Sequence, residues 1–382
     1  MKGRSGMIYL DYAAATPVLP EVADAMDFCM RHTYGNPSAV YAPAYDARRI
    51  LNESRRLLAS SIGSQTNEIV FTSGGTESNN AAVLGVARAC GRKRHLVIGS
   101  TEHHSVLSAA RHLKSAGYSV SLVPCDHNGI VGADAVERAI RPDTTLVSVQ
   151  YANNETGVIQ PVAAIGAAAK AHKVPFHCDA VSAYGHIPLN VEQDCIDLLS
   201  TSAHKLYGPK GVGFLYIRNG TPILPLMFGG AQEYRLRPGT QNIPAVAGFC
   251  KAVSCSGAYA NAADNPSLRD RLQTLIMQTL PDCRVNGANA PRLPGYLSVT
   301  FPGVPGERLL QELNDRGVCA AARAACATGE RTPSHVLRAM GLADAEADCT
   351  LRLTTGKFST LSEIEKAAAI ISEIVQNIKS GL

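Results

Sequence analysis

The chain has 382 residues, of which 46% are hydrophobic and 18% are charged, and its formal net charge is +4. This composition is typical of a globular protein with a large core, predicts two domains and excludes a disordered chain. The small net charge does not indicate a nucleic-acid-binding protein. No apolar run approaches the ~20 residues that span a bilayer.

Eleven cysteines are scattered along the chain without a Cys-x-x-Cys pair or a zinc-ligand spacing. An odd and dispersed set is typical of reduced thiols in a cytosol, and it predicts neither a disulfide framework nor a metal site. The N-terminus, MKGRSGMIYLDYAAATP, carries Asp11 where a signal peptide requires apolar residues, so we expect no export and a cytoplasmic location.

Strands and helices alternate along the first 220 residues. Apolar runs predict strands at 7–10, 68–72, 95–100, 119–123, 145–150, 174–177 and 213–217, and helical spacing predicts helices at 21–31, 44–60, 77–89, 105–116, 133–140 and 162–172. Strands separated by helices of about 10–15 residues favour a mostly parallel sheet that is covered on both faces.

A polar linker near residue 265, NAADNPS, marks the predicted domain boundary. The remainder alternates in an α+β manner, with helices at 268–279, 306–316 and 361–378, strands at 295–300 and 350–353, and a Ser-His turn at 334–335. We therefore predict a large domain over 14–260 and a smaller domain made of 1–13 and 261–382.

Three separated segments carry the strongest chemical signal. Residues 197–213, DLLSTSAHKLYGPKGVG, place Lys205 beside His204 and small hydroxyl residues, and Asp179 ends the apolar run FHCDAV. Residues 69–80, IVFTSGGTESNN, turn from a strand into a helix through two glycines, which lets backbone N–H groups approach an anion. Taken singly, the lysine segment is better explained by a solvated loop lysine, and the glycine segment by an ordinary strand-to-helix turn. Together they supply the amine, the acid and the phosphate cradle that pyridoxal phosphate requires.

Other polar residues follow predicted strands, where ligands bind in open α/β sheets. His103 comes after the strand at 95–100 and could stack on a ring, move protons, or simply be a hydrogen-bonded loop histidine. The segment 228–242 is too polar for a core, which favours a functional loop or a subunit contact.

Ten motifs in order give the chain a resemblance to a known family. They are YLDYAAATPV, GNPS, IVFTSGGTESNN, Glu102-His103, NNETGVIQP, HCDAV, SAHKLYGPKGVGFLY, RPGTQN, Ala325-Cys326 followed by PSHVLRAMG, and LRLTTGKFST. The chain resembles the cysteine desulfurases of the NifS/IscS type, in the class V aminotransferase family. The resemblance implies a pyridoxal-phosphate-dependent transferase of fold type I, with a mostly parallel seven-stranded sheet in the large domain and a smaller α+β domain that carries a catalytic cysteine loop.

The same resemblance implies roles for individual residues. Lys205 would form the Schiff base with pyridoxal phosphate, Asp179 would hold the pyridinium nitrogen, and His103 would stack on the ring. Contacts to the phosphate, the phenolic oxygen or the substrate are implied for Gly75, Thr76, Ser202, His204, Asn154 and Ser182. Thr240 would reach in from the partner subunit of a homodimer. Arg352 would bind the substrate carboxylate, with Asn36 nearby.

Cys326 matches the cysteine on which the family forms a persulfide. The implied reaction converts L-cysteine to L-alanine and leaves a persulfide on Cys326 for a sulfur-acceptor protein. A buried structural cysteine is the alternative for a single thiol. The acceptor pathway stays open among iron–sulfur cluster assembly, tRNA thiolation and DNA phosphorothioation.

Three positions depart from the family pattern. Arg323-Ala324 stands where Gly-Ser is usual, Ser182 stands where glutamine is usual, and Tyr41 follows GNPS in place of histidine. These departures favour a specialised branch. Selenocysteine lyase or another enzyme of this fold remains an alternative, as does a non-catalytic sulfur-transfer scaffold, although a scaffold would need neither Lys205 nor Cys326.

Overall fold

The computed structural model describes residues 6–91, 93–256, 266–322 and 333–381. Its main element is a seven-stranded sheet in the order β2-β8-β7-β6-β5-β3-β4. The strands are β2 (Ile69–Thr72), β3 (His95–Gly99), β4 (Ser119–Val123), β5 (Thr144–Ser148), β6 (Phe176–Asp179), β7 (Leu198–Ser200) and β8 (Gly213–Ile217). Strand β8 pairs antiparallel with β2 and β7, and the other strand pairs of this sheet are parallel. The prediction of a mostly parallel seven-stranded sheet is confirmed.

Helices cover both faces of this sheet, because successive strand residues point to opposite faces. Phe71, Val97 and Phe214 join one core cluster, whereas their neighbours Val70, Leu96 and Leu215 join another. The first cluster is covered by α2 (Ala42–Ser61), α6 (Val162–Ala171) and α7 (Ile243–Ser256), and the second by α3 (Gly75–Ala89) and α4 (His104–Ser115). Around them, α1 (Pro20–His32) packs on α7 and α5 (Ala133–Ala139) packs on α6.

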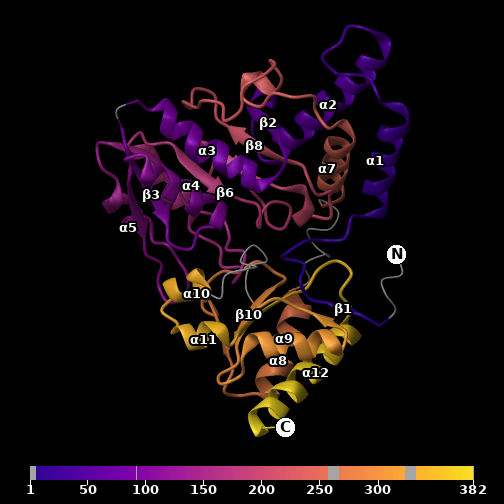
Figure 1. Ribbon diagram of the computed structural model, residues 1–382, viewed down its shortest axis with the longest axis vertical. Helices are drawn as coiled ribbons and strands as arrows, with labels where there is room; N and C mark the ends of the chain where they lie inside the picture. Colours follow the sequence, from indigo (N-terminus) through magenta and orange to yellow (C-terminus); the bar gives the residue numbers. More distant parts are fainter. Residues whose placement is uncertain (1–5, 92, 257–265, 323–332, 382) are drawn as a thin grey trace.

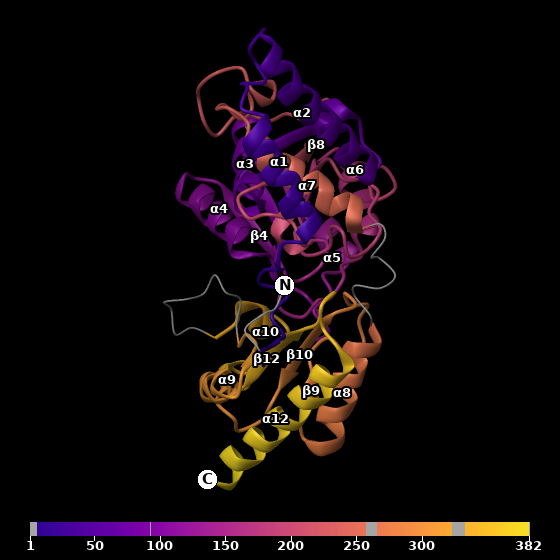
Figure 2. The same cartoon turned by 90° about the vertical axis from the view of Figure 1, so that its right-hand side faces the viewer.

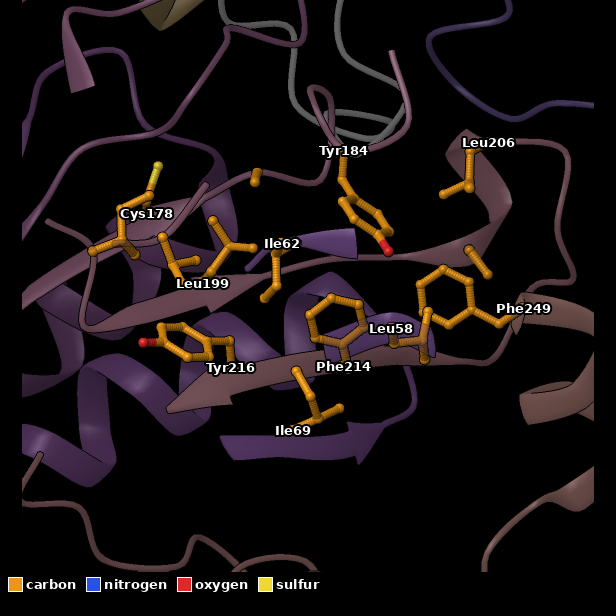
Figure 3. Packing of buried hydrophobic residues seen from close by; sticks show 14 of the residues in the cluster. Leu58, Ile62, Ile69, Cys178, Tyr184, Leu199, Leu206, Phe214, Tyr216 and Phe249 are labelled. Carbon is orange, nitrogen blue, oxygen red and sulfur yellow. The ribbon is translucent and has the colours of Figure 1, made fainter. Parts of the chain in front are cut away.

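Aromatic side chains hold the first cluster together (Figure 3). Phe214 on β8 stacks on Phe249 of α7 with ring centroids 5.8 Å apart, and Tyr184 meets Phe214 edge-on at 5.4 Å. Leu58 and Ile62, at the end of α2, fill the space beside these rings. This packing fixes the sheet against α2 and α7, so the strand ends that carry the site are firmly supported.

A second body lies below the large sheet in Figures 1 and 2. It contains the antiparallel sheet β12-β10-β9, with β9 (Arg284–Val285), β10 (Tyr296–Thr300) and β12 (Thr350–Thr354), and the helices α8 (Pro266–Thr279), α9 (Gly306–Asp315) and α12 (Leu361–Ser380). Its separate core includes Leu272, Phe301 and Leu351, together with Ile8 and Leu10 from the N-terminus. The separate core supports the proposed division into 14–260 and 1–13 plus 261–382, which stays a prediction.

The N-terminal segment connects the two bodies. Strand β1 (Ile8–Tyr9) pairs in parallel with β11 (Val318–Cys319), and Asp11 forms a bridge with Thr354 of β12. A few residues later, the Thr16 N–H and hydroxyl both donate to the carbonyl of His204, at 3.0 and 2.9 Å. Residues 11–16 therefore connect the small sheet with the turn after β7 of the large sheet.

Short elements differ from the sequence-based expectations. The helix expected from Glu77 begins two residues earlier at Gly75, and Glu68 belongs to the turn η1 (Thr66–Glu68) instead of a strand. Ser334 caps α10 (His335–Ala339), which precedes α11 (Asp344–Asp348). Neither helix was predicted, because five residues give too little periodicity. No helix in the described ranges is long and apolar enough to cross a membrane.

Candidate active site

A cavity of about 170 Å³ opens where the parallel strands of the large sheet end and the small body begins. Loops after β3, β5, β6 and β7 line it, because parallel strands deliver their carboxyl ends to one edge of the sheet. The predicted site residues among its walls are Gly75, Thr76, His103, Asn154, Asp179, Ser182, His204, Lys205 and Arg352.

Lys205 lies in the short turn η2 (Ala203–Lys205) that follows β7. Its ammonium Nζ donates to the carbonyl of Ala14 at 3.0 Å and to that of Ala13. The crossing N-terminal segment thus places two acceptors beside the amine. The lysine is accordingly a cavity residue and not a solvated loop residue.

The N-terminus of α3 forms the predicted anion cradle. Gly74 precedes the helix with φ +144°, a conformation that favours glycine, and as the N-cap residue it gives the first turn no side-chain cap. A Cβ on Gly75 would lie 2.5 Å from Val181 Cγ2, so the backbone approaches the wall of the cavity as closely as glycine permits. The uncapped helix N-terminus faces the cavity at Gly75 and Thr76 and suits a phosphate.

His204 lies on the cavity wall with Ser202 behind it. Ser202 is buried, and its hydroxyl lies 2.8 Å from His204 Nδ1. Burial, with smaller contributions from Lys205 and Lys210, lowers the pKa of His204 from 6.5 to about 4. The imidazole is therefore neutral at physiological pH and acts as a hydrogen-bonding group.

Asp179 ends β6, and His103 forms the N-cap of α4. Asp179 is buried and accepts hydrogen bonds on both carboxylate oxygens, from Asn79 at 2.6 Å and from the Val181 N–H at 2.9 Å. The His103 Nδ1 accepts from the Ser105 N–H at 3.1 Å. His103 is thus hydrogen-bonded, as one alternative proposed, and it also lines the cavity.

Glu102 is fully buried beside these groups. Burial and the nearby Asp179 raise its pKa well above 4.5, although a hydrogen bond from the Gln150 N–H opposes the rise. The protonated form of Glu102 is therefore favoured by the fold.

Arg352 enters the cavity from β12 of the small body. Its Nη1 donates to the carbonyl of Asn154 at 2.8 Å and its Nη2 donates to Asp11 Oδ1 at 2.7 Å. Within the described part of the chain, its buried Nε has no hydrogen-bond partner. A buried guanidinium donor in the wall of a cavity suits a carboxylate ligand.

Some predicted residues lie elsewhere. Asn36 and Thr240 are exposed and do not line the cavity of this chain, which neither supports nor contradicts the role of Thr240 toward a partner subunit. Tyr41 is an exposed residue that precedes α2. Cys326 and Arg323 lie outside the described residues.

Sequence reasoning missed several wall residues. Asn79 lies one helical turn after Gly75, so the i, i+4 spacing on α3 was a usable signal. Gln150 follows β5 and was visible as a strand-end residue. The carbonyls of Ala13 and Ala14 could not be predicted as wall groups from the sequence, because every residue has a backbone carbonyl.

The donor set fits pyridoxal phosphate. An amine, a carboxylate and a helix N-terminus share one cavity, and a Cβ on Gly75 would lie 2.5 Å from Val181 Cγ2, so the start of the helix packs closely against the loop after β6. Together with Arg352, these groups match the functional parts of that cofactor and of an amino-acid substrate.

Comparison with known proteins agrees with this geometry. The family model described as aminotransferase class-V matches residues 8–366. A cysteine desulfurase IscS from Methanosarcina thermophila is 41% identical over 376 residues, which cover 98% of this chain and 93% of that protein. A solved NifS-like protein has a TM-score of 0.90 at 34% identity and covers 97% of this chain and 99% of its own. A structure described as SspA in complex with cysteine has a TM-score of 0.83 at 34% identity, over 92% and 100% of the two chains.

The chain belongs to the class V aminotransferase family. The resemblance predicted from the sequence motifs is confirmed at the level of the family and of its NifS/IscS-type relatives.

Proposed function

We propose that this protein is a pyridoxal-phosphate-dependent cysteine desulfurase. The main observation in support is that one cavity is lined by Lys205, Asp179, the N-terminus of α3 and Arg352. The names of the relatives and the cysteine-bound structural neighbour support L-cysteine as the substrate. When bound, pyridoxal phosphate supplies an electron sink that stabilises negative charge at the substrate Cα.

The residues of the chain would act as follows. Gly75, Thr76, Ser202 and His204 hold the phosphate, Asp179 holds the ring nitrogen, and Asn154 and Ser182 lie toward the phenolic oxygen or the substrate. His103 packs on the ring face. Lys205 anchors the cofactor and moves the Cα proton, and Arg352 binds the substrate carboxylate, with Asn36 as a further candidate.

Cys326 would accept the sulfur. Its thiolate attacks the substrate sulfur, an S–S bond forms, and the Cβ–S bond breaks with its electron pair remaining on the carbon fragment. Protonation of that fragment gives L-alanine, and the enzyme holds a persulfide. The sum is L-cysteine plus a thiol giving L-alanine plus a persulfide, so no external oxidant is needed.

A homodimer and an acceptor protein complete the proposal. Phe228, in the segment 228–242 that carries Thr240, is 89% exposed, and an exposed aromatic side chain there favours a subunit contact. The persulfide would pass to an acceptor protein of iron–sulfur cluster assembly, tRNA thiolation or DNA phosphorothioation. A cytoplasmic location is proposed because the described cysteines are free thiols.

The test measures L-alanine and sulfide from L-cysteine with purified protein and a reducing thiol. We expect Lys205→Ala to lose the visible absorbance of the bound cofactor and the activity, and Cys326→Ala to keep the absorbance but lose desulfuration. Cys349→Ala is the matched cysteine control and should behave as wild type. Turnover of selenocysteine alone, or turnover that requires a keto acid, would replace this proposal with one of the alternative enzymes.

A further inference from the structure

Asn79 joins the two groups that would flank the cofactor ring. It is 1% exposed on α3 and lines the cavity. Its side-chain amide donates to Asp179 Oδ2 at 2.6 Å and to Ser105 Oγ at 2.8 Å. One amide group therefore connects the end of β6 with the start of α4.

The connection continues to the ring of His103. Ser105 Oγ lies 2.7 Å from His103 Nδ1, and the Ser105 backbone N–H donates to the same nitrogen at 3.1 Å. A backbone N–H can only donate, so Nδ1 is an acceptor and the neutral ring carries its proton on Nε2. Because Ser105 Oγ already accepts from Asn79, its own hydrogen is available to Nδ1.

The orientation of the Asn79 amide is fixed by the same contacts. With the amide reversed, its oxygen would face the Asp179 carboxylate, which is a repulsive contact between two acceptors. In the orientation present, Asn79 and the Val181 N–H each donate to one carboxylate oxygen of Asp179. Hydrogen bonds to a carboxylate stabilise its ionised form.

We propose that Asn79 is a positioning residue that fixes the hydrogen bonding of both ring-flanking groups, an inference that rests on the proposed roles of Asp179 and His103. Its hydrogen bond to Asp179 Oδ2 stabilises the carboxylate form of that side chain, which favours a proton on the ring nitrogen of pyridoxal phosphate. By donating to Ser105 Oγ it also directs the Ser105 hydroxyl, as a second donor, to the His103 Nδ1.

The test uses nitrogen chemical shifts in the holoenzyme, with ¹⁵N-labelled histidine and with pyridoxal phosphate labelled at the ring nitrogen. In Asn79→Ala we expect the cofactor signal to shift from the protonated toward the unprotonated ring, and the His103 Nδ1 signal to move as well. In Ser105→Ala only the His103 signal should move, because the bond from Asn79 to Asp179 remains. Asn80→Ala is the control, since among the described residues its side chain donates only to the carbonyl of Thr76 within the helix, and neither signal should move.

The outcomes separate this inference from the proposed function. A folded Asn79→Ala protein with both signals at their wild-type positions overturns the inference, even if the wild-type enzyme is an active desulfurase. A wild-type protein that binds no pyridoxal phosphate overturns the proposed function and this inference with it. Should Asn79→Ala fail to fold, the Ser105→Ala protein still decides, because an unmoved His103 signal there contradicts the link.

Discussion

Arg352 Nη2 donates a hydrogen bond to Asp11 Oδ1 at 2.7 Å, which ties β12 to the N-terminal segment. Both residues are largely buried, and their separation in the chain is 341 residues. The pair holds the guanidinium at the cavity wall, while the Nε donor has no partner in the described part of the chain.

Arg352→Lys should raise the KM for L-cysteine about 10- to 100-fold, because a hydrogen bond to a charged group contributes about 1.5–3 kcal/mol and each 1.4 kcal/mol is roughly tenfold. Alanine formation at varied L-cysteine concentrations measures it. Arg316→Ala removes an exposed arginine that pairs with Glu373 on the far side of the small body and should leave KM unchanged. An unaltered KM in Arg352→Lys would remove Arg352 from the substrate site.

Ser182→Gln should change the absorbance maximum of the bound cofactor or its pH dependence. Ser182 is 5% exposed and lines the cavity, and a longer amide there would reach groups that the serine hydroxyl cannot contact. Spectra recorded across a pH series test this. Identical spectra for wild type and variant at every pH would show that position 182 does not contact the ring.

Glu233→Ala should lower the free energy of unfolding by about 3–5 kcal/mol, because it leaves a buried guanidinium without its partner. Glu233 binds Arg55 through two hydrogen bonds of 2.7 Å and also accepts from the Phe71 N–H at 2.9 Å. It holds a turn, η3 (Glu233–Arg235), whose three residues all have positive φ. The ion pair between Glu233 and Arg55 therefore fixes the segment that leads to Thr240.

Urea unfolding measures this change. The control is Glu53→Ala, which breaks an exposed pair with Arg49 and should cost about 0.5 kcal/mol or less. An equal loss in the free energy of unfolding for the two substitutions would contradict this role of the Glu233–Arg55 pair.

His177 should make the protein less stable as the pH falls from 6.5 to about 4. Burial lowers the pKa of His177 from 6.5 to about 4. Between pH 6.5 and about 4, His177 is therefore protonated in the unfolded chain and neutral in the folded chain. The stabilisation is fully present above pH 6.5 and is lost on acidification, with a total of about 3 kcal/mol.

His177→Gln should flatten this part of the profile, since glutamine can still contact Ser148 and Ser200 but does not titrate. Urea midpoints of both proteins between pH 4 and 6.5 give the difference. Parallel profiles would mean that the pKa of His177 is the same in the folded and the unfolded chain. The comparison is needed because Glu102, whose pKa is raised, contributes in the opposite direction above pH 4.5.

The amino-acid sequence alone determined the sheet, the α3 cradle, and the positions of Lys205 and Asp179. These features depend on local signals: apolar strands of period two, glycines between a strand and a helix, and polar residues after strand ends. The same signals failed for α10 and α11, whose five residues are shorter than two helical turns.

Only the tertiary structure decided which groups act on one another. The carbonyls of Ala13 and Ala14 meet Lys205 across more than 190 residues, and Asn79 meets Asp179 across 100. Backbone carbonyls have no sequence signature, and the raised pKa of Glu102 follows from its burial in the folded chain. Such contacts and pKa shifts exist only when distant segments have packed together, so no local sequence pattern predicts them.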